Sequence, residues 1–140
     1  MKESVLTPHA ALVYLMVVVA SADSRMADEE IGAMSHSVAD LPAFKGYDRS
    51  WLVATVRACN TMLREKDGLE TVLGLVYAAL PHSVRDTAYA LASNTAASDG
   101  KVDQEESRLL EMMRDDMGIE RLTAAAIDRA VVALNRSLPA

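Results

Sequence analysis

The stretch Asp99-Gly-Lys-Val-Asp-Gln-Glu-Glu106 decides how this chain folds, because a near copy, Asp23-Ser-Arg-Met-Ala-Asp-Glu-Glu30, occurs 76 residues earlier. Each octapeptide follows a long, alanine-rich apolar stretch and precedes a second segment with the spacing of a helix. Together the two copies hold eight of the twenty acidic residues in sixteen positions. This repetition predicts an internally duplicated helical protein in which two carboxylate-rich corners each join a pair of helices.

Composition favours helices over the whole length. Hydrophobic residues make up 51% of the 140 residues, aromatic residues only 4%, and glycine and proline number six and four. These proportions are typical of helices rather than sheets, and the length suits one domain with its own core. We therefore predict a single domain over residues 1–140, a compact all-α bundle with an approximate internal two-fold repeat. Seven helices are expected. The first two begin near Pro8 and Asp28, Asp48 caps the third, and a break at Asp67-Gly68 separates the third from the fourth. The last three begin near Ser83, after Asp103 and near Arg121.

Short motifs locate several helix ends and one core face. Thr7 before Pro8 predicts an N-cap, and Asp103 with Glu106 forms the D-x-x-E pattern of a capping box. Gly118 suits the left-handed conformation that often ends a helix. In the last helix, the residues expected to face the core are Leu122, Ile127, Ala130, Val131 and Leu134.

Charge and cysteine content exclude several classes of protein. The net charge of −6 argues against a nucleic-acid partner, because phosphate binding needs a basic face. The apolar run of residues 10–22 is too short for a membrane span, which needs about 20 apolar residues. Although Ala20-Ser-Ala22 resembles a signal-peptidase site, Glu3 and Pro8 disturb the leader pattern, so we expect a core helix and a cytoplasmic protein without membrane insertion. The single cysteine, Cys59, excludes an internal disulfide framework and is expected to be buried.

The second acidic corner has the chemistry of a cation site. Gly100 allows the chain to reverse, and Asp99, Asp103 and Glu106 can then converge within one helical turn. Hard oxygen ligands of this kind suit Ca²⁺ or Mg²⁺. The corner is not an EF-hand loop, because Gln104 stands where that loop has its glycine.

The first corner offers fewer ligands. Asp23 and Glu30 match Asp99 and Glu106, whereas Ala27 stands at the position of Asp103. The alternative for both corners is that the acids only cap helices and favour the helix dipole. Ala27 cannot cap a helix as Asp103 does, yet Asp23, Glu29 and Glu30 are still present, which favours a role beyond capping.

Residues 80–119 carry several motifs in order. Leu80-Pro81 is followed by an alanine-rich helix, the acidic turn Asp99-Gly-Lys-Val102, the pair Glu105-Glu106 and the closing Met117-Gly-Ile119. This set resembles the TerB tellurite-resistance family. The resemblance implies an all-helical fold with an internal pseudo-repeat, a part in bacterial tellurite and general stress responses, and metal binding through the acidic corners. The first corner departs from the family pattern at Ser24 and Ala27.

Three functions remain as alternatives. The first, which the resemblance favours, is a non-enzymatic stress-response module that contacts partner proteins and binds a divalent cation, without an organic cofactor. Its expected metal ligands are Asp99, Asp103, Glu106, Asp23 and Glu30. The second is a pure protein-interaction domain with no metal site. The third, an enzyme for metal-assisted hydrolysis, is disfavoured because no nucleophile has a recognisable base beside it in the sequence and no glycine-rich phosphate loop occurs.

Overall fold

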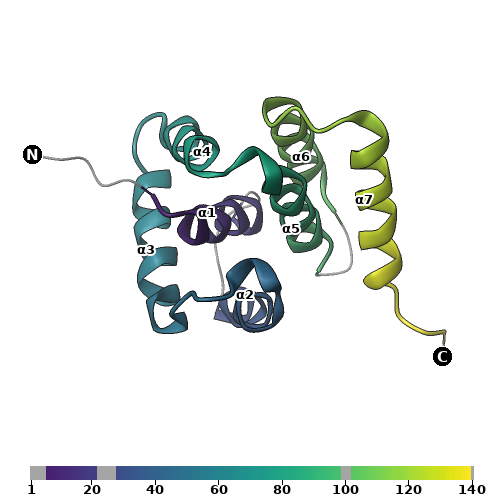
Figure 1. Cartoon of the computed structure of the whole chain (residues 1–140), viewed down its shortest axis with the longest axis horizontal. Helices are drawn as coiled ribbons and strands as arrows, with labels where there is room; N and C mark the ends of the chain where they lie inside the picture. Colours follow the sequence, from purple (N-terminus) through teal and green to yellow (C-terminus); the bar gives the residue numbers. More distant parts are fainter. Residues whose placement is uncertain (1–5, 22–27, 99–101, 140) are drawn as a thin grey trace, which may run out of the picture.

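Seven α-helices make up the described part of the chain, and no strand occurs in it, which confirms the all-α prediction (Figure 1). The computed structural model describes residues 6–21, 28–98 and 102–139, apart from the side chains of residues 28–30 and 33. No described helix combines the length and the hydrophobicity that a membrane span requires. The helices are α1 (Pro8–Ala20), α2 (Asp28–Asp40), α3 (Leu52–Leu63), α4 (Gly68–Ala79), α5 (Arg85–Ala97), α6 (Gln104–Asp116) and α7 (Arg121–Leu134), with 3₁₀ turns η1 (Pro42–Phe44), η2 (Arg49–Trp51) and η3 (His82–Val84).

Helix α1 occupies the centre of the molecule, with α3, α4 and α5 around it (Figure 1). Every residue from Ala11 to Ala20 is buried, because the sequence of α1 has no polar face to turn toward water. Thr7 caps the helix as predicted, since its hydroxyl accepts a hydrogen bond from the Ala10 amide at 3.1 Å. The hydrophobic core therefore forms around this first helix.

Helix α5 links the two parts of the bundle, since it packs against α1 and also against α6 and α7. Most of its buried side chains are small, which allows neighbouring helices to approach closely. Helix α7 lies at the end of the molecule opposite α3, with α5 as its main neighbour (Figure 1). The buried residues of α5 are Ala88, Tyr89, Leu91, Ala92, Ser93 and Ala96.

The turn between α3 and α4 is set by Asp67 and Gly68, where the sequence predicts a break. Asp67 adopts the left-handed conformation, with φ 57°, which aspartate enters more readily than most residues. Gly68 then begins α4 in a buried position against the backbone carbonyl groups of Met62 and Leu63. The close backbone approach explains why a residue without a side chain stands here.

Helix α7 turns a different face to the core from the one predicted. Val131 is buried and Ile127 half-buried, as expected. Leu122 and Leu134, however, are 78% and 82% exposed, and Ala130 is exposed as well. The prediction for these three residues is wrong, because apolar residues occupy nearly every side of α7 and periodicity cannot choose among them.

The lengths of four helices agree with the predicted repeat. Helices α1 and α5 have 13 residues each and begin 77 residues apart, at Pro8 and Arg85. Helices α2 and α6 also have 13 residues each and begin 76 residues apart, at Asp28 and Gln104. The two-fold superposition itself stays a prediction, because the matched acids at positions 23 and 99 lie outside the described residues.

Replacement of Gly68 by alanine tests the turn. A Cβ atom there would collide with the carbonyl oxygens of Met62 and Leu63, the second of them 2.8 Å away. We expect Gly68→Ala to lower the free energy of unfolding by about 1–3 kcal/mol, as overpacking usually does. The matched control is Gly74→Ala, because a Cβ at this exposed position of α4 meets nothing within 4 Å. It should raise the stability by about 0.5–1 kcal/mol through helix propensity. Equal effects in urea unfolding would contradict the steric account.

The thiol of Cys59 should be unreactive in the folded protein. Cys59 is buried and lies 3.8 Å from the Tyr14 carbonyl oxygen, and burial raises the pKa of its thiol from 9.0 to about 12. The folded state therefore holds the thiol proton more tightly than the unfolded state does. The contribution of the protonated thiol to the free energy of unfolding is complete below pH 9 and is lost as the pH rises toward 12. We expect an aromatic disulfide reagent at pH 8 to modify Cys59 only in denaturant. Rapid modification of the native protein would contradict this.

Candidate functional site

The capping box predicted at the start of α6 is present. Oδ1 of Asp103 accepts a hydrogen bond from the Glu106 amide at 2.8 Å, and Oε1 of Glu106 accepts one from the Asp103 amide at 3.1 Å. Asp103 has an extended backbone, with φ −82° and ψ 177°, as an N-cap residue requires. The two acids therefore lie side by side at the point where the second corner enters α6.

The two carboxylates of the capping box differ in their surroundings. Asp103 is exposed, whereas only 6% of Glu106 is exposed. A buried carboxylate is costly unless polar groups stabilise its charge. The Asp103 amide and the positive N-terminal end of α6 both do so. Capping thus gives a sufficient structural reason for both acids.

The same pair has the donor chemistry of a site for a hard cation. The capping hydrogen bond of Asp103 uses its Oδ1, and a carboxylate oxygen can accept more than one partner. Capping and coordination of Ca²⁺ or Mg²⁺ therefore do not exclude each other. Within residues 6–21, 28–98 and 102–139, however, no group of three or more His, Cys, Asp or Glu side chains is placed to hold an ion.

The remaining predicted ligands are Asp23, Glu30 and Asp99. Asp23 and Asp99 lie outside the described residues. Glu30 lies in the first turn of α2, but its side chain is outside the description. The structure thus brings together Asp103 and Glu106, and the convergence of the other three stays a prediction.

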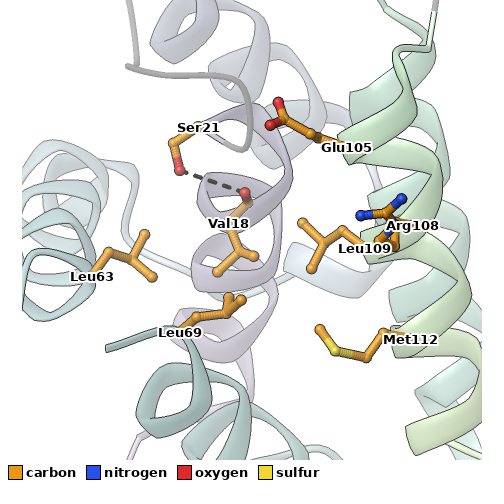
Figure 2. A pocket seen from close by; sticks show the side chains of 8 residues that line it. All are labelled: Val18, Ser21, Leu63, Leu69, Glu105, Arg108, Leu109 and Met112. Carbon is orange, nitrogen blue, oxygen red and sulfur yellow. Dashed lines mark hydrogen bonds between the residues drawn. The ribbon is translucent and has the colours of Figure 1, made fainter. Parts of the chain in front are cut away.

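An apolar pocket of about 490 Å³ lies beside the start of α6 (Figure 2). Its walls come from the end of α1, the end of α3, the start of α4 and the first turns of α6. Figure 2 shows apolar side chains from these helices around a shared space, with the charged Glu105 and Arg108 on the α6 side. The lining residues are Val18, Ser21, Leu63, Leu69, Glu105, Arg108, Leu109 and Met112.

Sequence reasoning did not find this pocket. Helical spacing assigns Leu109 and Met113 to the core face of α6, and both are buried. It places Met112 off that face, although Met112 lines the pocket. The pocket exists because four helices pack around it. The hydrophobic pattern of a single helix does not predict that arrangement.

Two tyrosines tie helices together through carboxylates. The Tyr89 hydroxyl of α5 lies 2.9 and 3.0 Å from the two oxygens of Asp128 in α7, and Ser93 donates to Asp128 at 3.0 Å. Burial, followed by the hydrogen bond and charge of Asp128, raises the pKa of Tyr89 to about 12. Tyr77 of α4 donates to Asp116 at 3.2 Å, and its pKa is raised mainly by burial. These groups hold α7 and the end of α6 to their neighbours.

Comparison with known proteins identifies a family. A family model described as tellurite resistance protein TerB matches residues 9–129, from the first turn of α1 to the middle of α7, so the matched region contains both acidic corners. Searches of the curated proteins and of the solved structures gave no match.

Substitution of Asp103 tests the N-cap. Asp103→Ala removes the acceptor for the Glu106 amide and should lower the free energy of unfolding by about 0.5–2 kcal/mol. Asp103→Asn is the matched control, because asparagine caps a helix nearly as well as aspartate and should retain most of the stability. Thermal unfolding followed by circular dichroism would measure both. If the asparagine variant were as unstable as the alanine variant, charge rather than capping would explain the effect.

Proposed function

The chain belongs to the TerB tellurite-resistance family, and we propose that it is a non-enzymatic helical module of a bacterial stress response in the cytoplasm. In this role it contacts partner proteins and binds a divalent cation, Ca²⁺ or Mg²⁺, at its acidic corners. The proposal involves no organic cofactor. It involves no nucleic acid either, because a net charge of −6 disfavours phosphate binding.

The pairing of Asp103 with the buried Glu106 carries the cation part of this proposal. Two carboxylates already meet there, and Asp99 precedes Asp103 by only four residues in the sequence. Asp99, Asp103 and Glu106 would hold the ion at the second corner, and Asp23 and Glu30 at the first. The bound ion would offset the negative charge gathered between α5 and α6 and stabilise the folded state by linkage.

The second corner should bind the cation more tightly than the first. Gly100 and Asp103 are present only there, since Ser24 and Ala27 occupy the matching positions of the first corner. With two proposed carboxylate ligands instead of three, the first corner should attract a doubly charged ion less strongly. We therefore assign the main site to residues 99–106.

The apolar pocket beside α6 supports the partner part of the proposal. Its volume of about 490 Å³ and its apolar lining are typical of sites that accept a ligand or the side chains of another protein. Glu105 and Arg108 add one charge of each sign on the α6 side, so polar groups of a partner could be oriented there. Because the start of α6 forms one wall, a cation at the corner would act on the same helix end that a partner contacts.

The alternative is a protein-interaction domain without a metal site. The observation that favours it is the capping box, which accounts for both Asp103 and Glu106 without an ion. The non-enzymatic part of the proposal is common to both alternatives. It is supported by the sequence, in which no nucleophile has a recognisable base beside it and no glycine-rich phosphate loop occurs.

A titration with Ca²⁺ and, separately, Mg²⁺ tests the cation site. We expect shifts of the backbone amide signals of residues 99–106, with a dissociation constant on the order of 10⁻⁴ to 10⁻³ M, as for open oxygen sites. Smaller shifts at higher concentration are expected for residues 23–30. Nuclear magnetic resonance spectra of the whole chain would record both corners in one experiment.

Two variants separate coordination from capping in this titration. Asp103→Asn keeps the cap but loses the charge, and should weaken cation binding by about tenfold, or about 1.4 kcal/mol. Glu105→Gln removes a neighbouring exposed charge that is not a proposed ligand, and should change binding by less than about twofold. Shifts only at residues 23–30 would reverse the order of the corners, and no shift at either corner would leave the interaction domain as the function.

A further inference from the structure

The outward side of α7 is an apolar surface on a helix at the edge of the molecule. α5 is the main neighbour of α7, and its opposite side is open in Figure 1. We define the α7 face by residues that are all exposed and that fall on one side of a helix by their spacing of three and four. They are Leu122, Ala125, Ala126, Arg129, Val132 and Ala133.

The charge of this surface is opposite to that of the chain. Arg121, Arg129 and Arg136 are exposed along α7 and just after it. Asp128, the only acid within α7, is turned inward and accepts hydrogen bonds from Tyr89 and Ser93. The helix therefore presents only positive charges along its outer side, in a protein whose net charge is −6.

A recess of about 340 Å³ borders the α7 face at Ala125. It is more polar than the pocket of Figure 2, and its lining balances two arginines, Arg114 and Arg121, against two aspartates, Asp115 and Asp128. Arg114 is engaged within the molecule, by an ion pair of 3.9 Å with Glu111 and by an interaction with the Tyr89 hydroxyl, whereas Arg121 is exposed. The lining residues are Arg114, Asp115, Ile119, Arg121, Ala124, Ala125 and Asp128.

We propose that the α7 face binds an acidic amphipathic helix of a partner protein, whose carboxylates pair with the exposed Arg121, Arg129 and Arg136. Leu122 and Val132 supply apolar contacts on either side of Arg129, and the alanines between them allow the two helices to approach closely. The arginines then pair with acids on the partner, which sets its orientation. This inference deepens the partner contact of the proposed function and rests on it.

The same features disfavour two other occupants. A second copy that offered the same face would bring arginine against arginine, which like-charge repulsion opposes. An anionic membrane would call for large apolar side chains along the middle of the face, whereas Arg129 and alanines lie there. A helix with carboxylates satisfies both the charge and the shape.

A displayed library of helical peptides provides the test. The peptides share a fixed row of leucines and vary among Glu, Gln and Lys at the flanking positions. We expect selection on the whole chain to enrich acidic peptides. Binding of an enriched peptide should weaken at least about tenfold in the double variant Arg121→Glu, Arg129→Glu.

The matched control is the double variant Arg49→Glu, Arg57→Glu, in which two exposed arginines with the same spacing lie on η2 and α3. It carries the same change of net charge and should alter binding by less than about twofold. Circular dichroism should show the same unfolding temperature for both variants within a few degrees, because all four side chains are exposed.

Several results would overturn the inference. They are enrichment of neutral or basic peptides, no enrichment, equal weakening by the control variant, binding to phosphatidylserine vesicles instead of peptides, or a dimer that Leu122→Ser dissociates. None of these results alters the cation titration at residues 99–106, and a failed titration leaves the peptide test intact. The two proposals can therefore fail separately.

Discussion

The enclosure of α1 is the constraint on which the rest of the structure depends. Every residue from Ala11 to Ala20 is buried, and a helix that is apolar on all sides is stable only when other elements cover all of them. Apolar surface left in water costs about 25 cal/mol for each Å², so α3, α4 and α5 must surround it. The sharp turn at Asp67 and Gly68 lets α4 fold back beside α3, and small side chains on α5 allow close packing on the other side.

The candidate site follows from this enclosure. With α1 in the centre, Val18 in its last turn and Ser21 just after it lie close to the start of α6, and the pocket forms between them. The capping box at Asp103 and Glu106 occupies the same helix end. Helix capping and cation binding both need acids there, because the first turn of a helix exposes amide groups and a positive dipole end. One short acidic motif can therefore cap the start of a helix and also supply carboxylate ligands for a cation.

Helix α7 shows how the packing of one acid can set the charge of a surface. Its only carboxylate, Asp128, is held by Tyr89 and Ser93 at the contact with α5. The arginines remain outside, so an acidic protein acquires a basic and apolar edge. The pocket beside α6 and the α7 face involve different helices, so the two contacts can be tested independently.

The sequence alone determined the all-α class, the seven helices, the core position of α1, the N-caps at Thr7 and Asp103, and the break at residues 67–68. Each of these depends on neighbouring residues in the chain or on a helix whose apolar pattern leaves no alternative. The tertiary structure decided which side of α7 is buried, because Leu122 and Leu134 are apolar enough for a core yet α5 covers another side. It also decided the inward position of Asp128 and the pocket shared by four helices. These features arise from contacts between residues far apart in the sequence. Hydrophobic periodicity within one helix does not indicate which other helices pack against it.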